Sequence, residues 1–348
     1  MAEQTKLVSS EKMKSAAETA QRVLEELDRI LVGRPALHRL VFVGILSRGH
    51  ILLEGLPGVG KTALIKTLGQ LLSLDFSRVQ FTPDLMPGDI LGAHILQQSG
   101  DGRREMVFQP GPVFTNILLA DEINRASPKT QSALLEAMQE KSVTLLGNTR
   151  SLPAPFFVLA SQNPIELEGT YPLPEAQLDR FLFKLEVASA SADTLKEIIT
   201  SRRHGEPPRA KFSLSLDELT ALFAVMDQIY LPTAVAEHIA RLVCATDPTG
   251  MNATLQVKEF VQYGASPRAA IAVAESARGV ALLAGRPSVG FEDVREVFVA
   301  ALNHRVLLNY KARFEGITSS ALLAGLLKDI RETDIDFSGG VAMTAAAS

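Results

Sequence analysis

A glycine-rich run in the first third of the chain has the residue types and spacing of a phosphate-binding loop. Residues Gly55–Thr62 read G-x-x-x-x-G-K-T and lie between a predicted strand and a predicted helix. The glycines let backbone N–H groups wrap a phosphate, and the helix that follows adds its positive end. Lys61 is expected to reach the β- and γ-phosphates of a nucleotide, and the Thr62 hydroxyl to bind Mg²⁺. The other predicted phosphate contacts are Gly55, Pro57, Gly58, Val59 and Gly60.

Two adjacent carboxylates follow a second apolar run. Residues 116–120 predict a buried strand, and Asp121 and Glu122 come directly after it. Because side chains alternate along a strand, the two are expected to point in different directions, giving one metal-side acid and one water-side acid. We predict that Asp121 holds Mg²⁺ through water and that Glu122 orients and deprotonates the attacking water.

An amide and two arginines complete the candidate chemistry. Asn163 follows the apolar run 155–160, and ligands bind at the carboxyl ends of parallel strands. It can hydrogen-bond a γ-phosphate or a water, although Asn before Pro also fits a simple turn. Arg180 precedes the last predicted strand and Arg268 opens a predicted helix. Guanidinium groups assist phosphoryl transfer, but each arginine alone also fits a surface salt bridge.

Five short apolar runs predict the sheet that positions these residues. Continuous apolar character is typical of strands covered on both faces, and helical patterns separate the runs. Two further helices are expected at 11–31 and from Pro35 onward, before the first strand. The fold class is therefore predicted as α/β with a parallel five-stranded sheet. The predicted strands are 51–53, 77–81, 116–120, 155–160 and 181–187.

Two interruptions of the strand and helix alternation predict β-hairpins. One lies at 93–108 and the other at 143–152, each with glycine at its turn. Irregular surface loops remain the alternative at both places.

The strand signal stops near residue 188, which predicts two domains. We expect a nucleotide-binding domain at 1–188, a linker at 189–208, a smaller all-α lid domain at 209–336 and a flexible tail at 337–348. Within the lid, Ser215 to Glu218 forms a predicted capping box. Ser266 is a predicted N-cap with Pro267 at the first helical position.

Composition excludes several classes of protein. With 46% apolar and 21% charged residues among 348, the chain is neither disordered nor fibrous. The net charge of −4 makes nucleic acid an unlikely partner. Cys244 is the single cysteine, so disulfides within the chain are impossible. We expect a cytoplasmic protein, because the sequence shows no signal peptide and no apolar run long enough for a transmembrane segment.

Four motifs together resemble the AAA+ ATPases, and within them the MoxR family, over about residues 11–334. They are the phosphate loop, the run Asp121–Ala126, the segment Phe81–Asp89 and the segment Glu175–Phe181. The combination is far more specific than any one motif.

The resemblance implies further roles for individual residues. Asn163 is implied as the sensor 1 residue, Arg180 as the finger supplied to a neighbour's nucleotide and Arg268 as the sensor 2 residue. Arg125 is a second candidate for the arginine that acts across an interface. The adenine is implied to lie near Leu31, Val32 and Gly33. The two hairpins occupy the places of inserts that face the ring pore in such proteins.

The expected function is that of an ATP- and Mg²⁺-dependent ring, hexameric by resemblance, that remodels or matures protein partners. A protein with a von Willebrand factor A domain is the client that the resemblance implies. One alternative is a chelatase-like or DNA-acting motor of the same clade. The acidic net charge of the chain argues against the DNA-acting motor. Another is a slow nucleotide-gated scaffold, against which the full hydrolytic set argues.

Overall fold

The computed structural model describes residues 8–56, 58–98, 104–163, 169–201 and 208–332. Pro57, the tip of the first hairpin, residues 202–207 of the predicted linker and the predicted tail 337–348 lie outside these ranges. Among the described residues, no helix is both long and apolar enough to cross a bilayer.

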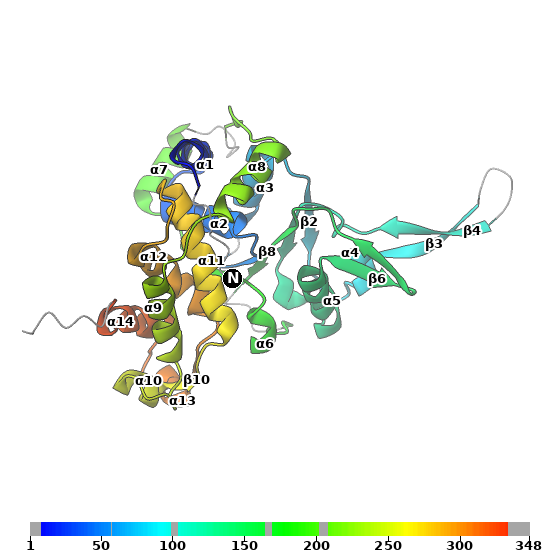
Figure 1. Cartoon of the computed structure of the whole chain (residues 1–348). Helices are drawn as coiled ribbons and strands as arrows, with labels where there is room; N and C mark the ends of the chain where they lie inside the picture. Colours follow the sequence, from blue (N-terminus) through cyan, green and yellow to red (C-terminus); the bar gives the residue numbers. More distant parts are fainter. Residues whose placement is uncertain (1–7, 57, 99–103, 164–168, 202–207, 333–348) are drawn as a thin grey trace, which may run out of the picture.

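A five-stranded, fully parallel sheet forms the centre of the first domain, as predicted (Figure 1). The strand order is β2-β5-β8-β1-β9, so β8 lies between β5 and β1. All five carboxyl ends meet at one edge, where ligands bind in such sheets. The strands are β1 (Ile51–Glu54), β2 (Phe76–Gln80), β5 (Ile117–Asp121), β8 (Phe157–Gln162) and β9 (Phe183–Glu186).

Helices cover both faces of this sheet, which explains the continuous apolar strands. Leu53 and Leu119 belong to one core cluster, whereas Leu52 and Leu118 belong to the other, so successive strand residues alternate between two cores. One core contains α2 (Pro35–Leu46) and α3 (Lys61–Leu71), and the other contains α4 (Pro87–Leu91) and α5 (Pro128–Glu140). Two short elements, the 3-10 helix η1 (Ile123–Arg125) and α6 (Glu175–Leu178), complete the domain.

Both predicted hairpins are present and project from the sheet domain (Figure 1). The first pairs β3 (Gly92–Gln98) with β4 (Arg104–Pro110), and the second pairs β6 (Ser142–Leu145) with β7 (Asn148–Ser151). The guanidinium of Arg150 lies 3.9 Å from the centre of the Phe108 ring, so the hairpins contact each other.

The second domain is a helical lid with one small two-stranded sheet, β10 (Val261–Tyr263) with β11 (Leu307–Leu308). The capping box is confirmed, because Ser215 accepts from the Glu218 N–H and Glu218 accepts from the Ser215 N–H. The lid helices are α8 (Leu216–Met226), α9 (Thr233–Cys244), α10 (Leu255–Phe260), α11 (Pro267–Leu283), α12 (Phe291–Leu302), α13 (Tyr310–Phe314) and α14 (Ser319–Asp329).

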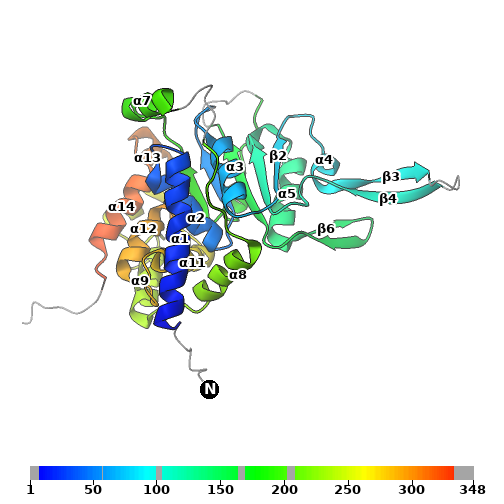
Figure 2. The ribbon, with the colours of Figure 1, turned by 90° about the horizontal axis from the view of Figure 1, so that it is seen from above.

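The N-terminal helix α1 (Ser10–Ile30) bridges the two domains (Figure 2). It packs against the lid helices α8 and α11 and also against α2 and α3. Its buried residues, among them Leu24 and Leu27, join the core cluster that the lid shares with one face of the sheet. The helix assigned to the first domain therefore also ties the lid to it.

Buried His50 makes stability depend on pH. It accepts from the Val158 N–H through Nδ1 and lies 3.2 Å from the Met138 carbonyl oxygen, and burial lowers its pKa from 6.5 to about 4. Between pH 6.5 and pH 4, His50 is protonated in the unfolded chain but stays neutral in the folded chain. We expect His50 alone to lower the free energy of unfolding by about 3 kcal/mol as the pH drops from 6.5 to 4.

Chemical denaturation of the wild type and of His50→Gln across this pH range tests the assignment. Glutamine keeps a donor and an acceptor but takes no proton. The free energy of unfolding should therefore change less steeply with pH in the variant than in the wild type. Buried His304, whose pKa burial lowers to about 3, should supply the remaining slope in the same direction. Equal slopes in both proteins would show that His50 is not responsible.

Candidate nucleotide-binding site

The phosphate loop connects the end of β1 to the start of α3. Gly58 and Gly60 have φ values of +79° and +91°, which side chains other than glycine rarely adopt. A Cβ on Gly58 would meet no described heavy atom within 4 Å, so the loop borders open space there. Gly60 is the N-cap of α3 and has no side chain to satisfy the first N–H groups. These donors are therefore available to an anionic ligand.

Lys61 is buried and turned back along the loop. Its Nζ donates to the Gly55 carbonyl oxygen at 2.6 Å. Burial lowers the pKa of Lys61, and the negative charges of Asp121, Glu122 and Glu54 oppose that shift. The ammonium group thus lies in the field of the two predicted catalytic carboxylates.

A cavity of about 390 Å³ brings together five residues predicted from different parts of the sequence. Lys61, Thr62, Asp121, Glu122 and Asn163 all line this space, which we call the carboxylate cavity. Asp121 ends β5, and Asn163 follows β8, the neighbouring strand. Its remaining lining residues are Gly58, Gly60, Ala63, Arg78 and Gln80.

The two carboxylates both line this cavity. Strand geometry ends at Asp121, and Glu122 has a φ of +57°, which turns its side chain back toward the cavity. The partners of the two nevertheless differ. Asp121 accepts from Arg78 at 2.7 Å and from Ser161, while Glu122 accepts from Gln80 at 2.7 Å and from Arg125.

Mg²⁺ fits this donor set. Among the described residues, no three His, Cys, Asp or Glu side chains form a metal cluster. Mg²⁺ needs no such cage, because it binds one or two protein oxygens and fills its octahedron with water and phosphate oxygens. The Thr62 hydroxyl and the Asp121 carboxylate border the same cavity and can supply those oxygens. Both Asp121 oxygens already accept hydrogen bonds, which favours contact through water.

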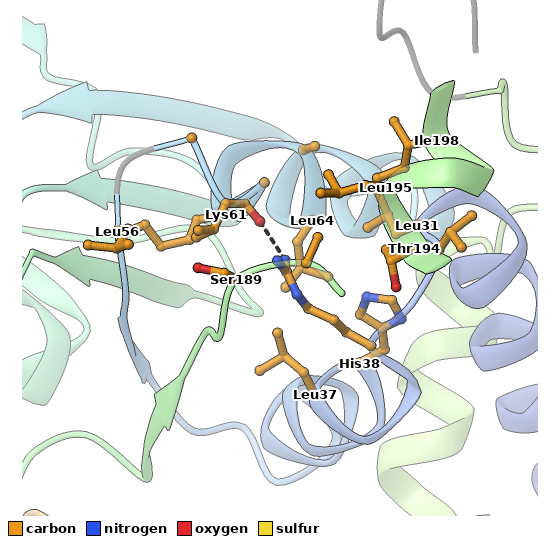
Figure 3. Close-up of a pocket in the computed structure, with 17 residues that line it drawn as sticks. Leu31, Leu37, His38, Leu56, Lys61, Leu64, Ser189, Thr194, Leu195 and Ile198 are labelled. Atoms are coloured by element: carbon orange, nitrogen blue, oxygen red, sulfur yellow. Dashed lines mark hydrogen bonds between the residues drawn. The ribbon is translucent and has the colours of Figure 1, made fainter. Parts of the chain in front are cut away.

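A larger cavity of about 530 Å³ adjoins the first, and both are lined by Gly58, Gly60, Lys61 and Ala63. We call it the α2–α7 cavity, after α2 and the helix α7 (Ala192–Ser201). Figure 3 shows Leu37 and His38 of α2 on one side of it and Thr194 and Leu195 on the other. Its size and apolar walls suit a nucleotide base. Its other lining residues are Leu31, Val32, Arg34, Leu56, Val59, Leu64, Ser189, Ala190 and Ile198.

Half of the segment predicted to be a linker is helical and forms a wall of this cavity. Helix α7 spans Ala192–Ser201, inside the predicted linker 189–208. Its apolar residues Leu195 and Ile198 recur at helical spacing, a signal that could have predicted the helix. Gly33, predicted near the adenine, is not among the lining residues, but a Cβ there would meet the Thr194 side chain at 2.4 Å.

Arg34 is a site residue that the sequence did not reveal. Its Nη1 donates to the Val59 carbonyl oxygen. Burial lowers the pKa of its guanidinium. The bond joins the start of α2 to the phosphate loop, so Arg34 fixes the loop beside the α2–α7 cavity. The sequence did not reveal Arg78, Gln80 or Ser161 either, because no motif marks these residues.

Two predicted arginines, Arg180 and Arg268, line neither cavity. Arg180 donates to the Leu135 carbonyl oxygen of α5 at 2.6 Å, and Arg268 lies 3.5 Å from the Asp179 carboxylate. Ser266 occupies the N-cap of α11, but its hydroxyl contacts Asp179 rather than its own helix. Neither arginine side chain therefore lines a cavity beside the phosphate loop of its own chain.

Comparison with known proteins identifies the family. Residues 50–183 match the model of the ATPase family associated with various cellular activities (AAA), and residues 253–325 match the AAA lid domain model. Chaperone MoxR1 of Mycobacterium tuberculosis is 44% identical, over 92% of this chain and 84% of its own. The chain belongs to the MoxR family of AAA ATPases. The predicted family and fold class are thereby confirmed.

Two further matches cover nearly the whole of this MoxR-family chain. The uncharacterised protein YeaC of Bacillus subtilis is 40% identical, over 89% of this chain and 93% of its own. A crystal structure of a protein from Cytophaga hutchinsonii, described as a candidate ATPase, has a TM-score of 0.83 and 38% identity. That match covers 92% of this chain and 97% of the other. The arrangement of sheet domain and lid is thus shared with a solved structure.

Proposed function

We propose that this MoxR-family chain hydrolyses ATP and uses the cycle to remodel, activate or mature protein partners. One observation carries the proposal: the carboxylate cavity places Lys61, Thr62, Asp121, Glu122 and Asn163 together beside the phosphate loop. A purely nucleotide-gated scaffold needs the loop but not the hydrolytic residues. The adjoining α2–α7 cavity supplies space for the base.

Each residue of the carboxylate cavity has a distinct task. The loop N–H groups, Lys61 and the N-terminus of α3 hold the phosphates, and Thr62 and Asp121 hold Mg²⁺. Bound Mg²⁺ would neutralise phosphate charge. Glu122 accepts the proton of the attacking water, and Asn163 orients that water or the γ-phosphate.

Arg180 and Arg268 serve the nucleotide of a neighbouring subunit in a ring, which we take to be a hexamer. This assignment is supported by the fact that neither arginine lines a cavity of its own chain. Arg125 is the weaker candidate for a trans role, because its Nη1 is paired with Glu122 of the same chain at 2.9 Å.

The client is a protein, and we propose one with a von Willebrand factor A domain. The two hairpins present exposed apolar side chains, among them Leu96, Met106 and Leu146, that can contact a polypeptide. A chelatase-like role uses the same ATP cycle and is tested by the identity of the client. A DNA-acting role requires salt-dependent DNA binding.

Removal of Mg²⁺ tests the proposed chemistry. We expect steady-state ATP hydrolysis to stop when EDTA exceeds Mg²⁺ and to return when Mg²⁺ is added back, because Thr62 and Asp121 supply too few ligands to retain the ion alone. Phosphate release is the measurement. Hydrolysis that persists in excess EDTA would contradict the assigned roles of these two residues.

A further inference from the structure

Three consecutive residues directly after α12 dock the lid onto the edge of the sheet domain. The Asn303 amide donates to the Lys184 carbonyl oxygen at 3.0 Å, and His304 lies 3.0 Å from the Phe181 carbonyl oxygen. Arg305 follows and makes the densest set of contacts. Asn303 thus reaches β9, the edge strand of the sheet, and His304 and Arg305 reach the segment that leads into it.

Arg305 uses all five of its N–H donors, although it is deeply buried, with 4% of its side chain exposed. Nε donates to the Asp179 carboxylate at 2.7 Å. Nη2 donates to the carbonyl oxygens of Asp179 (3.0 Å) and Phe181 (2.7 Å). Nη1 donates to the carbonyl oxygens of Leu182 (3.1 Å) and Ala301. Four of the five bonds therefore reach the chain on either side of Arg180.

These bonds fix the backbone that carries Arg180 without touching its side chain. The Arg180 guanidinium meets the Leu135 carbonyl oxygen and is partly buried. It can exchange that partner for a phosphate while its backbone stays anchored to the lid. Arginine is suited to this anchoring role, since its planar fork reaches several acceptors at once and lysine cannot reproduce the geometry.

We infer that Arg305 is a positioning residue for the nucleotide site of the neighbouring subunit, because it locks the backbone on both sides of Arg180 to the lid helix α12. The inference rests on the proposed trans role of Arg180. The lid then has a second task besides covering the sheet domain of its own chain. A movement of the lid therefore also moves Arg180. The position of the lid in one subunit thus determines where Arg180 lies in the nucleotide site of the next subunit.

Mixed rings separate this role from a merely structural one. An Arg180→Ala chain keeps its cavities but offers no arginine, whereas a Lys61→Ala chain offers the arginine but lacks a working phosphate loop. Mixed one to one, they should regain up to about a quarter of wild-type turnover, because about a quarter of the ring interfaces join an intact cavity to an intact arginine. Arg305→Lys is then added to one chain or to the other.

We expect a strong asymmetry. Arg305→Lys in the Lys61→Ala chain should lower the regained turnover about 10- to 100-fold, because an ångström of misplacement can cost about 100-fold in rate. The same change in the Arg180→Ala chain should leave the regained turnover within about twofold of its value without Arg305→Lys. Arg295→Lys, an exposed change on the preceding helix α12, should have no effect in either chain.

Each other outcome overturns the inference. Equal loss in both placements means a structural role, no loss in either means no role, and the reverse asymmetry means action on the chain's own site. Asp179→Asn leaves the four carbonyl contacts of Arg305 in place and should show the same asymmetry, even if Arg305→Lys fails to fold. Without regained turnover in the first mixture, the trans role of Arg180 fails, and the inference falls with it.

Discussion

Glu122→Gln is expected to lower steady-state ATP turnover by roughly 10²- to 10⁴-fold, the usual contribution of a general base. Glutamine has nearly the same shape and can still accept from Gln80 at the 2.7 Å contact seen for Glu122, but it cannot take a proton from water. The contacts of the phosphate loop and Lys61 remain. ATP should therefore bind with nearly unchanged affinity, and the assembly should stay in its ATP-bound state.

Two measurements on this variant decide the role of Glu122. Phosphate release gives turnover, and equilibrium binding of ATP shows that the cavity is intact. Glu237→Gln, an exposed change on the lid helix α9, is the matched control and should retain full turnover. If Glu122→Gln hydrolyses ATP at the wild-type rate, Glu122 is not the base.

Arg180→Ala is expected to abolish turnover, with a loss of about 10³- to 10⁵-fold, the range for an arginine that meets the charge of phosphoryl transfer. Arg180 lines neither cavity of its own chain, so nucleotide affinity should remain mostly intact. The local structure should also survive, because the segment stays anchored by Arg305. Arg313→Ala, an exposed change on α13, is the control.

The motifs and elements of the site could be predicted because their signals are local. The glycines and Lys61 occupy one eight-residue string, and each strand is a short apolar run that needs no distant partner to be recognised. The parallel sheet then follows from the alternation of strands with helices. Once the sheet is accepted, the meeting of Asp121 and Asn163 at one edge is a consequence of strand direction.

The contacts that complete the site depend on distant parts of the chain. Arg305 and Asp179 are 126 residues apart, and Arg78 meets Asp121 across 43 residues. No spacing rule marks such pairs, since only the packed fold brings them together. The backbone turn at Glu122 could not be predicted for a related reason, because the strand rule applies only as far as Asp121.

The place of the helices in space was equally beyond the sequence. The pattern of residues 11–31 predicts a helix, but nothing in it shows that α1 packs on the lid as well as on the sheet domain. Helix α7 was interpreted as linker because the charged and proline-rich residues after it dominate the composition of that segment. Its role as a wall of the α2–α7 cavity is visible only in the folded chain.

The central claim is that each catalytic site is completed by an arginine from a neighbouring chain. The most direct test is ATP turnover in a one-to-one mixture of Arg180→Ala and Lys61→Ala chains, each of which should be inactive alone. The account predicts that mixing restores turnover, and that restoration rises and falls with the fraction of mixed interfaces. A mixture as inactive as its two components, although the chains assemble together, would contradict the claim.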